Sequence, residues 1–160
     1  FGLAAVARKA GSFSLTPLMH EITPGTWLAS APTLAMVIAG LFIVFLAENS
    51  RIPVDDPNTH LELTMIHEVM ILDHSGVDLG YIEYAASLKL WILGSLLIGL
   101  AVPIRSGTPA IDLLAMFAGM IGLAVVIGVI ESTMARFRMS MVPLFLVGAC
   151  VLSIIGFIIQ

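Results

Sequence analysis

The chain has 160 residues, of which 59% are hydrophobic and only 11% are charged. Soluble domains carry about 25% charged residues, so this composition excludes a soluble enzyme and a disordered chain. The net charge of −4 provides no basic surface for nucleic acid, and the single cysteine, Cys150, excludes an internal disulfide and a cysteine-based metal site. The composition is that of a membrane protein.

Four stretches are long and apolar enough to cross a membrane, which takes about 20 residues of helix. In chain order they are residues 27–47, 81–104, 111–130 and 139–159. We therefore predict an all-α, polytopic transmembrane helix bundle that forms one membrane domain over residues 1–160. Residues 1–7 are typical of the last turns of a helix, so we expect the C-terminal part of a larger subunit.

The positive charges do not orient the bundle. Arg8, Lys9 and Arg105 fall on one side of the predicted membrane. Arg51, Arg136 and Arg138 fall on the other side, which gives a tie under the positive-inside rule.

The loop over residues 48–80 contains seven of the eleven acidic residues and three of the four histidines. Asp56 followed by Pro57 is a helix start signal, because an N-cap carboxylate precedes a proline at the first helical position. We predict an amphipathic helix over residues 57–73. On a helical wheel, Glu62 and Asp73 fall within its apolar arc.

Buried carboxylates are costly unless they are paired or protonated, and within membranes they often mark ion or proton paths. Glu62 and Asp73 are therefore candidates for such a path. The alternative is that both carboxylates pair with Arg51, with Lys89 or with another subunit.

The histidines of this loop do not predict a metal site. His67 and Glu68 begin an HExxH pattern, but Ile71 stands where the second histidine is required. His60, His67 and His74 are seven residues apart, which is about 10 Å along a helix and too far to share one ion. We expect no metal ligands and no catalytic residues in this chain.

Two charged residues lie within the second predicted spanning helix. Glu83 and Lys89 are six residues apart and do not share a helix face, so Lys89 needs a partner elsewhere or a water-filled cavity. Small residues spaced by four, such as Ala115 with Gly119 and Ala118 with Gly122, predict close helix packing.

The start of the acidic loop resembles a known signature. Glu48, Arg51, Pro53 and Asp55 match the Glu-x-x-Arg-x-Pro-Phe-Asp of subunit 1 of respiratory complex I, with Val54 in place of the phenylalanine. The next stretch, residues 56–68, and residues 131–136 resemble the membrane subunit of formate hydrogenlyase and hydrogenase-4. This group comprises energy-converting nickel–iron hydrogenases, and the resemblance covers essentially the whole chain.

The resemblance implies the second half of an eight-helix subunit in a prokaryotic inner (plasma) membrane, with loop 48–80 on the cytoplasmic side. The implied partners are the hydrogenase large and small subunits, a ferredoxin-like iron–sulfur subunit and an antiporter-like membrane subunit. The nickel–iron centre and the iron–sulfur clusters would lie in those partners, so no cofactor is expected in this chain.

By the same analogy, acidic and basic side chains form a proton or ion path or dock the peripheral arm. The candidates are Glu48, Arg51, Asp55, Asp56, Glu62, His67, Glu68, Asp73, Glu83, Lys89 and Glu131, with Arg136 and Arg138 in a second docking loop.

The leading hypothesis is a non-catalytic subunit that anchors the hydrogenase arm and helps couple electron transfer to proton or sodium translocation. Two alternatives stay open. One is a quinone-site subunit of NADH–quinone oxidoreductase, although Val54, Asp73 and His74 depart from that pattern. The other is an ion-coupled secondary transporter, which the loop signature disfavours.

Overall fold

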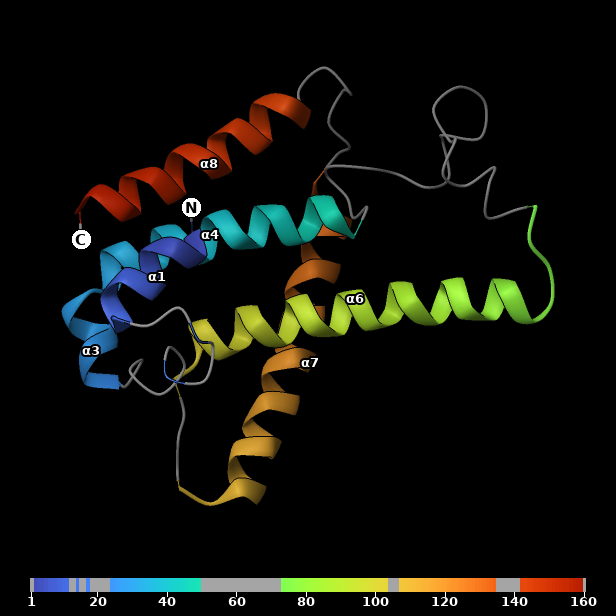
Figure 1. Ribbon diagram of the computed structural model, residues 1–160, viewed down its shortest axis with the longest axis horizontal. Helices are drawn as coiled ribbons and strands as arrows, with labels where there is room; N and C mark the ends of the chain where they lie inside the picture. The colour runs from blue at the N-terminus through green and yellow to red at the C-terminus, as the bar shows by residue number, and fades with distance from the viewer. Residues whose placement is uncertain are drawn as a thin grey trace.

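The computed structural model describes residues 2–11, 14, 17, 24–49, 73–103, 107–134 and 142–159. Most of these residues are helical, and no strand occurs among them. The helices are α1 (Gly2–Ala10), α3 (Pro24–Ala29), α4 (Ala31–Glu48), α6 (Val77–Ala101), α7 (Pro109–Thr133) and α8 (Val142–Ile159) (Figure 1).

The predicted all-α membrane architecture is confirmed. Helices α4, α6, α7 and α8 are each long and apolar enough to cross a membrane. The chain is therefore a multi-pass membrane protein. The predicted loop helix over residues 57–73 lies outside the described residues except for Asp73, which occupies a turn.

Helices α4 and α6 have boundaries that differ from those of the apolar runs. Helix α4 begins at Ala31 rather than near residue 27, because the backbone leaves helical geometry at Ser30 and Trp27 belongs to the short helix α3. Helix α6 begins at Val77 and ends at Ala101, since Val102 precedes a proline and leaves helical geometry. A search for apolar runs does not detect a helix start that contains a charged residue, such as Asp78 in the first turn of α6.

Helices α4 and α8 form a tight antiparallel pair (Figure 1). A Cβ atom added to Gly40 would lie 2.6 Å from Ser153 Oγ and 3.0 Å from the carbonyl oxygen of Ala149. A Cβ on Gly156 would lie 3.3 Å from the carbonyl oxygen of Thr33. The two backbones approach closely because small residues face each other, which is how membrane helices associate without a hydrophobic driving force.

Helix α1 packs against both helices of this pair. Ala5, Val6 and Ala7 are buried in a cluster with residues of α4 and with Leu100 of α6. The guanidinium of Arg8 lies 5.0 Å from the centre of the Phe157 ring on α8, an attractive cation–π geometry. Leu100 thereby places the C-terminal end of α6 beside the first half of α4.

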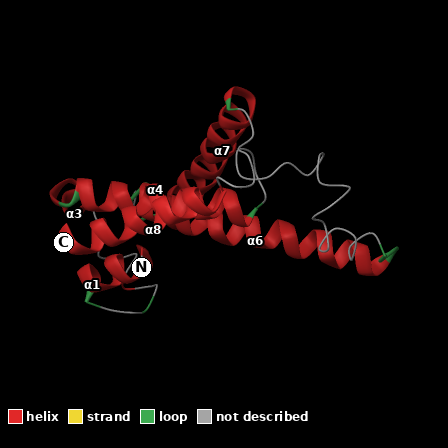
Figure 2. Cartoon of the chain, turned by 90° about the horizontal axis from the view of Figure 1, so that it is seen from above, coloured by secondary structure: helices red, strands yellow, loops and turns green. Residues whose placement is uncertain are grey.

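Helix α7 crosses α6 steeply and projects away from the other helices (Figures 1 and 2). At the crossing, a Cβ on Gly119 would lie 2.5 Å from Ile98 Cγ2, so this predicted small residue does make a close approach. A Cβ on Gly122, the glycine of the other predicted pair, would have nothing within 4 Å. Leu123 and Ile127 are the buried residues of α7.

Candidate functional site

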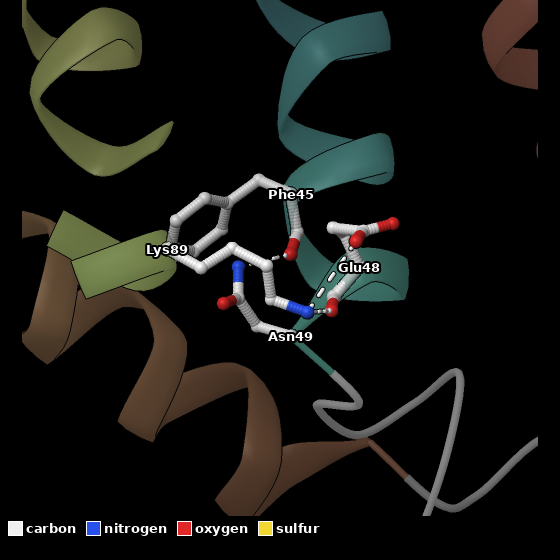
Figure 3. A network of polar contacts seen from close by, with 4 residues as sticks. All are labelled: Phe45, Glu48, Asn49 and Lys89. Carbon is white, nitrogen blue, oxygen red and sulfur yellow. Dashed lines mark hydrogen bonds and ion pairs between the residues drawn. The ribbon is translucent and has the colours of Figure 1, made fainter. Parts of the chain in front are cut away.

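Lys89 of α6 finds its partner at the C-terminal end of α4. Its ammonium donates a hydrogen bond to the main-chain carbonyl of Glu48 at 2.7 Å and lies 3.3 Å from Oε1 of the same residue (Figure 3). The sequence predicts that Lys89 needs a partner outside its own helix, and the structure confirms this. The partner, 41 residues away, is itself one of the predicted site residues.

The pair is open to its surroundings, because the Lys89 and Glu48 side chains are 45% and 56% exposed. Exposed ion pairs contribute about 0.2–1 kcal/mol. The main-chain contact adds a second effect, since a cation at the carboxyl end of a helix interacts favourably with the helix dipole. Lys89 therefore both neutralises Glu48 and caps α4.

Asn49 completes the end of α4. Its side-chain Nδ2 donates a hydrogen bond to the carbonyl of Phe45 at 2.8 Å, and its backbone N–H reaches the same oxygen at 3.2 Å (Figure 3). The last carbonyls of a helix have no partner within the helix, so an asparagine at this position supplies the missing donors. Asn49 and Lys89 together satisfy the carbonyls of Phe45 and Glu48.

A cavity of about 310 Å³ adjoins this end of α4. Its lining brings together two carboxylates and one ammonium, although Glu83 and Lys89 do not share a helix face. The cavity therefore has a net charge of −1 when all three groups are ionised. Ser87 also lines it and donates its hydroxyl to the carbonyl of Glu83 at 2.9 Å. The lining residues are Glu48, Asn49, Glu83, Ala86, Ser87, Lys89 and Leu90.

Groups that exchange protons beside a polar cavity are what an ion or proton path requires. Glu48, Glu83 and Lys89 were singled out in the sequence, and the structure assembles them in one place. Asn49 and Ser87 were not among the candidates. An asparagine just after an apolar run, here following Glu48, is a C-cap signal that could have identified Asn49.

The remaining candidates do not join this cavity. Asp73 is exposed in a turn before α6, so its predicted burial in an apolar arc is wrong. Glu131 is half-buried in the last turn of α7 and does not line the cavity. Eight others lie outside the described residues and stay predictions: Arg51, Asp55, Asp56, Glu62, His67, Glu68, Arg136 and Arg138.

A second cavity of about 200 Å³ lies between the end of α6 and the start of α7. Ser95 and Asp112 contribute polar atoms to its lining. Within the part of the chain that the structure describes, no group of three or more His, Cys, Asp or Glu side chains could hold a metal ion.

Comparison with protein-family models identifies the family to which the chain belongs. A family model described as NADH dehydrogenase matches residues 1–160. The chain belongs to the NADH dehydrogenase family. Comparisons with the curated proteins and with the solved structures gave no match.

As a NADH dehydrogenase family member with four helices fit to span a membrane, the chain is a membrane subunit of a respiratory-type oxidoreductase. Membership also gives the ion pair a context. Glu48 is the first residue of the signature that the sequence shares with subunit 1 of complex I, and it is the residue that Lys89 holds. The signature thus begins where α4 ends, at the edge of the polar cavity.

Proposed function

We propose that the chain is the membrane-anchor and ion-coupling subunit of an energy-converting nickel–iron hydrogenase of the formate hydrogenlyase type. It holds the peripheral arm at the membrane and helps link electron transfer to proton or sodium movement. The hydrogenase assignment rests on the resemblance of residues 56–68 and 131–136 to that branch of the family. No redox centre is assigned to this chain; the nickel–iron centre and the iron–sulfur clusters belong to the partners.

The observation that carries the coupling role is the cavity at the end of α4. Two carboxylates and a lysine from two helices line it together. The ammonium of Lys89 lies on Glu48, while Glu83 lines the same cavity and is not paired with Lys89. Lys89 neutralises the charge of Glu48 but not that of Glu83. A proton or cation could therefore move between two carboxylates that differ in local charge. We assign Glu48, Lys89 and Glu83 to the start of the ion path.

The second candidate is the quinone-site subunit of a NADH–quinone oxidoreductase. Membership of the NADH dehydrogenase family supports it equally. A secondary transporter, the third candidate, is disfavoured because the family match covers residues 1–160.

The discriminating experiment uses the full-length protein, purified in mild detergent with its partners. Co-purifying subunits are identified by mass spectrometry, nickel and iron are assayed, and hydrogen evolution is measured with a reduced dye. Nickel, iron and hydrogen evolution in one particle support the hydrogenase. Iron with bound quinone and no nickel assigns the chain to complex I. A chain that purifies alone without metal contradicts both.

The coupling role is tested in the same complex with Glu83→Gln. We expect ion translocation per electron transferred to fall while assembly and hydrogen evolution with the dye persist. Asp78→Asn is the matched control, because Asp78 is an exposed acid of α6 that does not line the cavity. Equal coupling in both variants and the parent would contradict the assignment of Glu83.

A further inference from the structure

The cavity between the end of α6 and the start of α7 lies near the membrane end opposite Glu48. Its lining on α6 begins at Ser95, which is about 9 Å further along that helix than Lys89, the residue that contacts Glu48. Within the same stretch of α6, Leu100 shares a buried cluster with Val37 in the first half of α4, whereas Glu48 is the last residue of α4. This cavity and the one at Glu48 therefore occupy opposite halves of the membrane region.

Gly99 lines this cavity with main-chain atoms, because it has no side chain. In a regular helix its carbonyl accepts a hydrogen bond from the residue four positions later. That residue is Pro103, which has no N–H, whereas the preceding carbonyl, that of Ile98, does accept a bond from the N–H of Val102 at 2.8 Å. The Gly99 carbonyl therefore lacks its helix partner and belongs to a residue that lines the cavity.

Two side chains, one from each helix, add further oxygen atoms. Asp112 is half-buried in the first turn of α7, and Ser95 lies on α6. The Ser95 hydroxyl donates its proton to the Ile92 carbonyl at 2.9 Å, which leaves its oxygen lone pairs as acceptors. None of the described residues that line the cavity is basic. The other lining residues are apolar: Ile98, Gly99, Val102, Pro103, Ala115 and Met116.

These oxygen atoms suit a hard cation with one positive charge. Carbonyl and carboxylate oxygens are the ligands that such cations prefer, whereas transition metals favour nitrogen or sulfur. The single carboxylate balances one unit of charge, and a divalent ion would leave a second charge uncompensated in apolar surroundings. The dipole at the carboxyl end of α6 favours a cation and the dipole at the amino end of α7 opposes it, so Asp112 decides the sign. A cavity of about 200 Å³ also has room for water ligands, each of about 30 Å³.

We propose that this cavity binds a monovalent alkali cation such as Na⁺, with the Asp112 carboxylate, the Gly99 carbonyl and the Ser95 hydroxyl as ligands and water in the remaining positions. Carbonyls at the carboxyl ends of interrupted membrane helices coordinate Na⁺ in transporters. The sequence indicates no metal ligands because two of these three groups are not His, Cys, Asp or Glu side chains. That this cation is the transported ion rests on the proposed function, whereas its binding does not.

The test measures sodium binding to the purified, full-length complex in a sodium-free choline buffer. Radioactive Na⁺ is titrated by equilibrium dialysis against the parent complex and the variants Asp112→Asn and Pro103→Ala. We expect Asp112→Asn to weaken binding at this site by about tenfold or more, because the charge that balances the cation is removed. Pro103→Ala supplies an N–H for the Gly99 carbonyl and should weaken binding by roughly three- to tenfold, while the charge of the cavity stays the same. Sodium sites on other subunits contribute equally in every variant.

Asp78→Asn is the matched control, because Asp78 is an exposed acid of α6 that does not line the cavity. It should bind Na⁺ as the parent does. Ser95→Ala, which removes a neutral ligand, should weaken binding by about threefold. If Asp112→Asn does not assemble, Pro103→Ala and Ser95→Ala provide the test. K⁺ and Li⁺ should displace Na⁺ from this site, and Ca²⁺ at the same concentration should not, because one carboxylate is too few for a divalent ion.

Three outcomes overturn the proposal. Equal Na⁺ binding by the parent and by Asp112→Asn shows that the carboxylate holds no cation. Unchanged affinity of Pro103→Ala removes the Gly99 carbonyl as a ligand. Displacement by Ca²⁺ at lower concentrations than by K⁺ excludes a monovalent site. Nickel and Na⁺-dependent translocation are assayed in the same preparation, so a wrong hydrogenase assignment or a wrong coupling role is distinguishable from a wrong cation site.

Discussion

Replacing Lys89 by methionine should release α6 from the end of α4. Methionine keeps an unbranched chain of similar reach but removes the ammonium. Two contacts are lost, the hydrogen bond to the Glu48 carbonyl at 2.7 Å and the ion pair at 3.3 Å. The ion pair is half-exposed and contributes about 0.2–1 kcal/mol. A charge-assisted bond to a carbonyl contributes about 1.5 kcal/mol at its lower limit, and exposure reduces that further. The expected loss is about 1–2 kcal/mol.

The magnitude is measured through thermal unfolding of the purified complex, with a double-mutant cycle between Lys89→Met and Glu48→Gln. Glu48→Gln removes the carboxylate charge but leaves the main-chain carbonyl, so it should cost less than Lys89→Met. The coupling energy of the cycle isolates the ion pair and should stay below about 1 kcal/mol. Lys89→Arg should recover part of the loss. Equal costs for the two single variants would refute the cap on α4, and a coupling energy near zero would refute the ion pair.

Further variants test the packing and the cap. Gly40→Ala should lose about 1–3 kcal/mol of stability, because its Cβ would meet the Ala149 carbonyl at 3.0 Å. Gly148→Ala should be neutral or stabilising, because its Cβ would have nothing within 4 Å. Thermal unfolding in detergent measures the difference between the two variants. Gly119→Ala should weaken the crossing of α6 and α7 while Gly122→Ala does not, measured by the yield of monodisperse protein, and equal yields would contradict the crossing. Asn49→Ala should lower the unfolding midpoint by an amount that corresponds to about 0.5–1.5 kcal/mol, since the Phe45 carbonyl loses its side-chain donor, and an unchanged midpoint would argue against the cap.

The sequence was sufficient for the number and approximate position of the spanning helices, because each is a predominantly apolar run of sufficient length. Helix pairing was not predictable in the same way. The tight α4–α8 contact depends on Gly40 meeting Ala149 and Ser153, and these residues are more than 100 positions apart. Periodicity within one helix shows which face carries small residues, but it does not show which other helix packs against that face. The small residues of α7 show this, since Gly119 makes a contact and Gly122 does not.

The site was predictable in its residue types but not in its geometry. An unpaired lysine in an apolar helix demanded a partner, and the partner proved to be Glu48 on another helix. The spacing of Glu83 and Lys89 argued against a shared site, yet both line one cavity because the end of α4 approaches the same stretch of α6. Asp73 is exposed in a turn, whereas the helical wheel placed it within the apolar arc at the end of the predicted loop helix.

The glycine contacts between α4 and α8 restrict which parts of the subunit can move. Backbones that touch through Gly40 and Gly156 have no side chains to slide over, so the two helices translate and tilt as one body. Helix α6 contacts α4 through the buried side chains of Leu97 and Leu100 and, at Glu48, through a half-exposed lysine on a flexible stem. Any relative movement of these helices is therefore expected between α6 and the α4–α8 pair rather than within that pair.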